Sequence, residues 1–193
     1  MGQVNRYFPR YKKNQFSVLL CETITQELNA QCRLSPLNNI TAGHDLAVLV
    51  LSEPVTFGPR VWPVCLPSPA DSPLISENMK LSTAGFGVRE ITDTERIYAE
   101  IINEASVTVA NQESCKSSWK LIGDQICAKG SVAPAGPERL PDTCSGDSGG
   151  GLTAQRFDDN FVLVGVVSFG EAECGARDGR PGVYTNILSH VKW

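Results

Sequence analysis

The stretch "PDTCSGDSGGGL", residues 141–152, decides how this sequence is interpreted, because it surrounds one serine with the residues that a nucleophile needs. Ser148 follows Asp147 directly and lies four positions after Cys144. Glycines on both sides allow a tight turn, and the amides of Gly146 and Ser148 can point at a developing oxyanion. Taken alone, the pattern also fits a glycine-rich surface turn. A serine hydroxyl is a weak nucleophile that needs a general base, and the sequence contains only two histidines.

The composition of the 193 residues is that of a globular protein, with 41% hydrophobic and 20% charged residues, enough for one good core or two small ones. The formal net charge of -4 gives no basic footprint, so we expect neither nucleic acid nor an anionic membrane as a partner. The apolar run "LAVLVL", residues 46–51, is far shorter than the roughly 20 residues that span a bilayer and predicts a buried strand. The N-terminal stretch lacks the apolar core of a secretory signal.

Seven cysteines nevertheless indicate an oxidising, extracellular compartment, because no CxxC metal motif occurs among them. An odd number leaves one cysteine for a partner chain or as a free thiol. The seven are Cys21, Cys32, Cys65, Cys115, Cys127, Cys144 and Cys174.

Short apolar runs separated by proline and glycine clusters predict an antiparallel all-β fold, a sandwich or a barrel. Helix signals are sparse: residues 111–119 fit a short helix capped by Asn111 with Glu113 in its first turn, and the last residues fit the start of another. The proline-rich residues 62–73 cannot continue a central strand and predict a connection between two β units.

Three ordered segments together resemble the trypsin-like (chymotrypsin-fold) serine protease family. They are residues 141–152, "GHDLAVLVLSEPVTFGPRVWPVCLP" at 43–67 and "VSFGEAECGARDGRPGVYTNI" at 167–187, with "GFG" at 85–87, "QICA" at 125–128 and "VKW" at the end as shorter matches. The resemblance covers the chain from about Gly43 onward. It implies two antiparallel six-stranded barrels, with an incomplete first barrel and its connection in residues 1–67 and the second barrel in residues 68–193.

The resemblance assigns catalytic roles to residues of two segments. Ser148 matches the nucleophile, and the amides of Gly146 and Ser148 match the oxyanion hole. Asp45 matches the acid that orients the histidine, although outside this family it would be an ordinary loop acid before a buried strand. No cofactor and no metal is implied, because this chemistry uses side chains and backbone dipoles.

Substrate recognition is implied by residues on both sides of the serine. Asp142 matches the base of the primary specificity pocket, whose open walls match Gly170 and Gly182, and a buried carboxylate there favours peptides or proteins with Arg or Lys before the scissile bond. The alternative is that Asp142 only forms a surface turn. Ser168, Phe169 and Gly170 match the segment that pairs with the substrate backbone.

The cysteines and one asparagine carry further expectations. The resemblance implies the disulfides Cys115–Cys127 and Cys144–Cys174, and it implies that Cys65 links the chain to a light chain or pro-segment. Asp147 matches the residue that pairs with a new N-terminal amine after activation. Cys21 and Cys32 remain as a candidate local bridge, and Asn39 begins a glycosylation sequon.

The general base is the one catalytic residue that these matches do not assign. His44 precedes Asp45 directly and should point to the opposite side of the chain, and His190 reads as a surface residue or helix cap. In the family the histidine precedes the aspartate by roughly forty-five residues, a position just before Met1. We therefore expect a fragment of a secreted Arg/Lys-specific endopeptidase that is inactive alone, with its histidine upstream; the alternative is a non-catalytic homologue that binds or regulates.

Overall fold

The structure is a computed structural model that describes residues 43–51, 54–59, 61–92, 94–130 and 139–192, together with the backbone of residues 31–34. The expectations for Cys21 and Asn39 lie outside these residues, and Cys32 is described only as a backbone position. No helix among the described residues is long and apolar enough to cross a bilayer.

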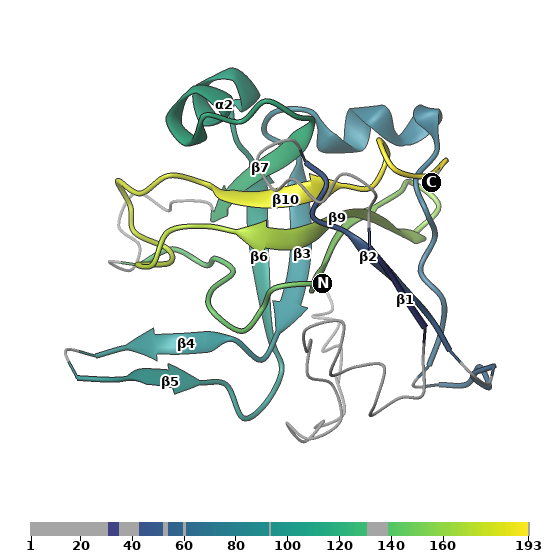
Figure 1. Ribbon diagram of the computed structural model, residues 1–193, viewed down its shortest axis with the longest axis horizontal. Helices are drawn as coiled ribbons and strands as arrows, with labels where there is room; N and C mark the ends of the chain where they lie inside the picture. Colours follow the sequence, from purple (N-terminus) through teal and green to yellow (C-terminus); the bar gives the residue numbers. More distant parts are fainter. Residues whose placement is uncertain are drawn as a thin grey trace, which may run out of the picture.

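Six strands form a closed barrel in the order β10-β7-β6-β3-β8-β9, and every neighbouring pair is antiparallel (Figure 1). This confirms the all-β expectation and the six-stranded second barrel. The strands are β3 (Lys80–Gly85), β6 (Asn103–Val109), β7 (Gln125–Gly130), β8 (Gly151–Gln155), β9 (Phe161–Phe169) and β10 (Gly182–Asn186).

The barrel interior is filled by one apolar cluster drawn from all six strands. Alternate residues of β3 and β8 are buried, as expected for strands with one face toward a core. Tyr184 and Leu152 are fully buried at its centre. The cluster comprises Leu81, Val107, Val109, Ile126, Ala128, Leu152, Ala154, Val162, Val164, Val167 and Tyr184.

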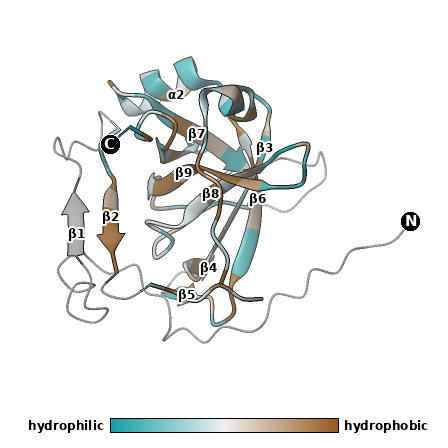
Figure 2. Cartoon of the chain, turned by 90° about the vertical axis from the view of Figure 1, so that its right-hand side faces the viewer, coloured by the Kyte–Doolittle hydropathy of each residue, from teal (hydrophilic) through white to brown (hydrophobic). Residues whose placement is uncertain are grey.

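Two further ladders lie outside the barrel. Strands β4 (Val88–Ile91) and β5 (Arg96–Tyr98) pair with each other, and β1 (Gln31–Leu34) pairs with β2 (Ala47–Val50). The prediction of a strand within residues 46–51 is confirmed, but the prediction that it is buried is wrong: all four residues of β2 are exposed. Figure 2 shows β2 as a hydrophobic strand beside β1, and within the described residues no second layer covers it.

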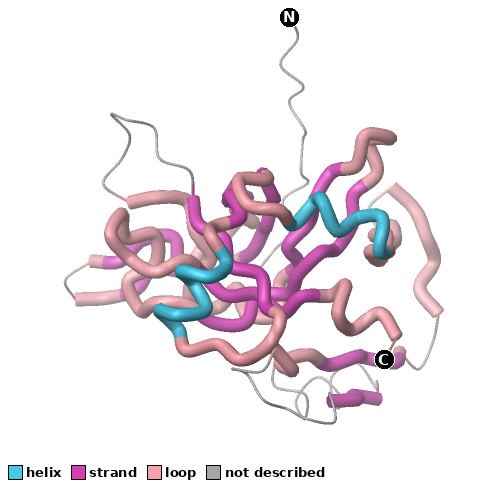
Figure 3. Tube along the Cα trace, turned by 90° about the horizontal axis from the view of Figure 1, so that it is seen from above, coloured by secondary structure: helices cyan, strands magenta, loops and turns pink. Residues whose placement is uncertain are grey.

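Helix α2 (Gln112–Trp119) and the 3-10 helix η3 (Pro69–Ile75) lie at the same end of the barrel in Figure 1. Figure 3 shows that the two helices are apart from each other. Helix α2 confirms the predicted helix, because the Asn111 side chain accepts a hydrogen bond from the Ser114 amide at 2.9 Å. Residues 188–192, where the sequence predicts the start of another helix, form consecutive turns instead.

The proline-rich connection contains the 3-10 helix η3 (Pro69–Ile75), which the sequence did not indicate. Asp71 in its first turn accepts hydrogen bonds from the Ser68 amide and hydroxyl, each at 2.8 Å, and two from Arg156 at 2.6 Å. These contacts, led by those from Arg156, hold the pKa of Asp71 well below its usual range. Since Arg156 directly follows β8, the bidentate pair attaches the connection to the barrel.

Candidate active site

The loop that carries Ser148 is a pair of tight turns between Cys144 and β8. The Asp147 amide donates to the Cys144 carbonyl at 3.0 Å, and the Gly150 amide donates to the Asp147 carbonyl at 2.9 Å. Gly146 has a φ of 98°, a conformation that a side chain would strain. The turns leave Ser148 exposed to solvent.

The end of β9 anchors this loop. The Gly149 amide donates to the Val167 carbonyl at 2.9 Å, and the Val167 amide donates to the Gly150 carbonyl at the same distance. The two residues after Ser148 are therefore hydrogen-bonded to the main chain of Val167, which directly precedes Ser168 in β9.

The same end of β9 also holds Asp45, which lies more than one hundred residues earlier in the sequence. The Ser168 hydroxyl donates to Asp45 Oδ2 at 2.5 Å, and the Thr185 hydroxyl donates to the Asp45 carbonyl at 2.8 Å. The segment before β2 and the Ser148 loop thus meet at two consecutive residues of β9, Val167 and Ser168. Sequence reasoning missed the Ser168 contact with Asp45, because no local signal pairs these residues.

The two histidines contact each other. His44 Nδ1 lies 3.4 Å from His190 Nε2, and His190 Nδ1 lies 2.8 Å from the Asn186 carbonyl oxygen. His44 therefore faces the C-terminal turns, whereas the carboxylate of Asp45 faces β9. In the part of the chain that the structure describes, neither histidine hydrogen-bonds to Ser148.

Asp142 lies six residues before Ser148 and is partly buried. Its carboxylate accepts hydrogen bonds from the Thr143 amide at 2.8 Å and the Gly175 amide at 3.0 Å. Burial raises the pKa of Asp142 above its usual value of 3.8, although the two amide hydrogen bonds oppose this effect. A cation that enters this site would relieve the cost of burying the charge.

Gly170 and Gly182 lie close together beside Asp142. A Cβ added to Gly182 would lie 3.4 Å from Asp142 Oδ1, and one added to Gly170 would lie 3.7 Å from the Gly182 Cα. The two glycines are neighbours because Val183 of β10 pairs with Phe169 at the end of β9.

Phe169 adds an aromatic surface next to these glycines. Its ring meets Trp119 of α2 edge to face, with centroids 5.3 Å apart. The Arg180 guanidinium carbon lies 3.5 Å from the Trp119 ring centroid, and Arg180 Nε donates to Glu171 at 2.9 Å. No local pattern indicated that Trp119 and Arg180 lie in one cluster with Phe169, because the three residues come from separate segments of the sequence.

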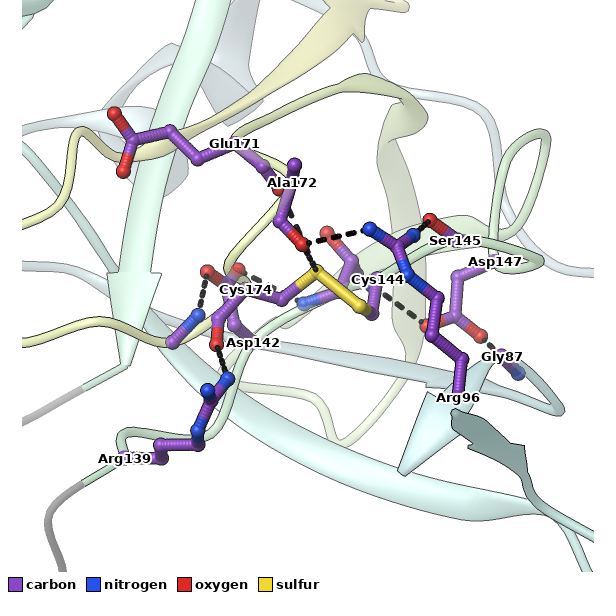
Figure 4. The surroundings of a disulfide bond; sticks show 12 residues. Gly87, Arg96, Arg139, Asp142, Cys144, Ser145, Asp147, Glu171, Ala172 and Cys174 are labelled. Carbon is purple, nitrogen blue, oxygen red and sulfur yellow. Dashed lines mark hydrogen bonds between the residues drawn. A yellow bond between two sulfur atoms is a disulfide. The ribbon is translucent and has the colours of Figure 1, made fainter. Parts of the chain in front are cut away.

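Asp147 lines a cavity of about 330 Å³. One carboxylate oxygen accepts from the Gly87 amide at 2.7 Å and the other from the Cys144 amide at 2.9 Å, as Figure 4 shows. Asp142 and Asp147 both line this cavity. Arg89 and Arg139 line the same cavity, so its walls carry charges of both signs.

Replacement of Gly87 with alanine should destabilise this arrangement. The added Cβ would lie 2.5 Å from Asp147 Cγ, and Asp147 cannot retreat without losing its two amide hydrogen bonds. We expect a loss of about 1–3 kcal/mol in the free energy of unfolding, measured by urea denaturation. Gly58→Ala is the matched control, because a Cβ there meets nothing within 4 Å; equal midpoints for the two variants would contradict the prediction.

The structure contains both disulfides that the resemblance implies. Cys144 and Cys174 tie the Ser148 loop to the segment after β9, with Cα atoms 5.5 Å apart (Figure 4), and Cys115 of α2 is bonded to Cys127 of β7. Cys65 is free and exposed among the described residues.

Comparison with known sequences identifies the class. Residues 24–193 match the Trypsin family, and the chain therefore belongs to the trypsin family of serine proteases. It is 40% identical over 153 residues to CLIP domain-containing serine protease B10 of Anopheles gambiae and 35% identical over 150 residues to phenoloxidase-activating factor 1 of Holotrichia diomphalia. Both alignments cover 78% of this chain and 38% of the relative.

A third relative, inactive CLIP domain-containing serine protease A8 of Anopheles gambiae, is 30% identical over 158 residues, or 81% of this chain and 41% of the relative. The chain thus spans less than half the length of these three relatives.

Proposed function

We propose that this chain is the nucleophile-bearing part of a trypsin-like serine endopeptidase, with Ser148 as the nucleophile and Asp45 as the acid that orients the base. The observation that carries the proposal is the meeting of the two residues' segments at Val167 and Ser168. A nucleophile loop and a partly buried carboxylate that are fixed to the same end of one strand have an arrangement that a histidine can bridge.

In this mechanism the general base is a histidine from a segment outside this chain, since His44 and His190 contact each other. The histidine takes the Ser148 hydroxyl proton as the oxygen attacks the substrate carbonyl, and it later protonates the leaving amine. Asp45 stabilises the imidazolium, and the Ser168 hydroxyl holds the Asp45 carboxylate in place. The amides of Gly146 and Ser148 stabilise the oxyanion.

In the proposal, specificity for Arg or Lys follows from Asp142, which lies beside Gly182. Its partly buried carboxylate with a raised pKa favours a cationic side chain. Ser168, Phe169 and Gly170, at and after the end of β9, pair with the substrate backbone as an added strand.

Activation in the proposal uses the cavity at Asp147. A new N-terminal ammonium that enters the cavity replaces the Gly87 and Cys144 amides as the partner of Asp147. The loop on which Asp147, Gly146 and Ser148 lie then rearranges.

The protein in the proposal is extracellular and acts on protein or peptide substrates. Its two disulfides are typical of oxidising compartments, and the free, exposed Cys65 is suited to a bond with a light chain or pro-segment. A Cys21–Cys32 bridge, a glycan at Asn39 and the division of the chain at residues 67 and 68 belong to the same proposal.

A non-catalytic homologue is the second candidate. It is favoured by the engagement of both histidines with each other, and one relative is named as inactive. Such a protein keeps Ser148, Asp45 and Asp142 as parts of a binding surface without a base.

The transcript upstream of the codon for Met1 separates the two candidates. We expect an in-frame Ala-His-Cys segment a short distance before it. Intact upstream exons that encode no such histidine would overturn the protease and leave the non-catalytic homologue.

A further inference from the structure

Residues 175–181 connect Cys174 to β10, and both ends of this connection lie against Asp142. At one end, the Gly175 amide donates a hydrogen bond to Asp142 Oδ2 at 3.0 Å. At the other end, a Cβ added to Gly182, the first residue of β10, would lie 3.4 Å from Asp142 Oδ1. The course of the connection therefore determines what surrounds the Asp142 carboxylate.

Lys129 of β7 holds the middle of this connection. Its Nζ donates hydrogen bonds to the carbonyl oxygens of Arg177 and Gly179, both at 2.6 Å. Two carbonyls that are two residues apart in the chain thus turn toward one ammonium group. Lys129 is partly buried, and burial of an ammonium group is costly unless it is hydrogen-bonded. Because hydrogen bonds from a charged donor are stronger than neutral ones, Lys129 fixes the connection to the barrel.

The Lys129 ammonium also acts on two carboxylates. A Cβ added to Gly179 would lie 2.6 Å from Glu171 Oε2, so the Glu171 carboxylate approaches the residue whose carbonyl Lys129 binds. Glu171 has its own partner, since Arg180 Nε lies 2.9 Å from it. Asp142 differs, because no lysine or arginine in the described part of the chain forms an ion pair with it. Its charge therefore depends on more distant cations.

The charged groups near Asp142 come from several elements. Burial raises the pKa of Asp142, its two amide hydrogen bonds and the charge of Lys129 oppose this rise, and the charge of Asp147 adds to it. Tyr184 of β10 stays uncharged, because burial raises the pKa of its hydroxyl. The Arg139 guanidinium donates to a main-chain carbonyl at 3.2 Å (Figure 4). Lys129 is thus the cation that acts on Asp142 from the barrel.

We propose that Lys129 is a positioning residue of the Asp142 site. Its ammonium group fixes the connection that encloses Asp142, and it supplies a positive charge that keeps the carboxylate ionised before a substrate binds. The inference rests on the proposed function of Asp142 in the recognition of Arg or Lys. It adds a residue that no motif of the sequence indicated.

Nuclear magnetic resonance of the 193-residue chain tests this role without reference to activity. The carboxyl carbon of Asp142 and the ammonium nitrogen of Lys129 are followed as the pH is lowered until Asp142 is protonated. Because the charge of each group acts on the other, the Lys129 nitrogen signal should shift over the same pH range as the Asp142 carbon signal. A Lys129 signal that stays constant across the titration of Asp142 would overturn the proposal.

Lys129→Met keeps an unbranched apolar side chain and removes the charge. The pKa of Asp142 should rise further in this variant, by about half a unit to one unit, which is less than the effect of an ion-pair partner within about 4–6 Å. Lys129→Arg retains the charge and should keep the parent value. Lys80→Met, at an exposed lysine that begins β3, is the matched control. Equal pKa values of Asp142 in the parent and in Lys129→Met would contradict the proposed role.

The activated longer protein provides the functional readout. Because the preference for Arg or Lys needs an ionised Asp142, it is lost as the pH falls through the pKa of Asp142, and Lys129→Met should move this loss to higher pH. Loss at the same pH in the parent and in Lys129→Met would overturn the inference alone. A parent protein with no preference for Arg or Lys would instead refute the pocket assignment, and the titrations of the 193-residue chain would still decide the role of Lys129.

Discussion

The substitution Ser148→Ala should abolish ester and peptide hydrolysis by the longer protein, in which this chain is joined to its proposed histidine segment. The expected loss in kcat is about 10⁴- to 10⁶-fold, because removal of the nucleophile leaves only binding and oxyanion stabilisation. The measurement is steady-state hydrolysis of an arginine ester by the activated protein.

Ser145→Ala is the matched control for this experiment. Ser145 lies three residues earlier in the same loop, and its hydroxyl accepts a hydrogen bond from Arg96 at 2.7 Å. We expect this variant to stay within about tenfold of the parent, because it loses one exposed hydrogen bond, about 0.5–1.5 kcal/mol, and keeps the nucleophile. A Ser148→Ala protein as active as Ser145→Ala would remove Ser148 from the mechanism.

The substitution Asp142→Ser should remove the preference for Arg or Lys before the scissile bond. Breaking a buried ion pair costs about 3–5 kcal/mol, which corresponds to about 10²- to 10⁴-fold in kcat/KM for an arginine substrate. A substrate with a neutral side chain before the scissile bond should lose much less. Asp158→Ser, in an exposed turn, is the control, and an unchanged Arg/Lys profile in Asp142→Ser would refute the pocket assignment.

The pH dependence of the same preference provides a second test. Burial raises the pKa of Asp142, and only its ionised form attracts a cation, so the preference should be lost as pH falls through a value above 3.8. The ratio of kcat/KM for arginine and neutral substrates isolates this effect, because protonation of the catalytic base lowers both values equally. A ratio that declines only below pH 3.8 would contradict the raised pKa.

Local signals and the family resemblance predicted much of the fold. The cap at Asn111 indicated helix α2, because a side-chain oxygen that satisfies a free amide is a local feature of the sequence. Short apolar runs separated by proline and glycine clusters indicated the β-strands. The family resemblance implied the disulfides Cys115–Cys127 and Cys144–Cys174, and the structure contains both.

Contacts between distant segments could not be predicted in this way. The Ser168 hydroxyl reaches Asp45 across 123 residues, and His44 meets His190 across 146, so neither pair leaves a periodic or spacing signal. The exposure of β2 was also not predicted. An apolar run indicates that burial of the strand would be favourable, but it does not show which segment would cover the strand.

The rate at which an organic fluorophosphonate labels Ser148 tests the central claim most directly, namely that Ser148 is a nucleophile whose base lies outside this chain. The 193-residue chain should be labelled very slowly, and the activated longer protein should be labelled rapidly at Ser148 alone, as mapped by peptide mass spectrometry. Rapid labelling of the 193-residue chain would show that its own residues provide the base, and failure to label Ser148 in the longer protein would contradict its assignment as the nucleophile.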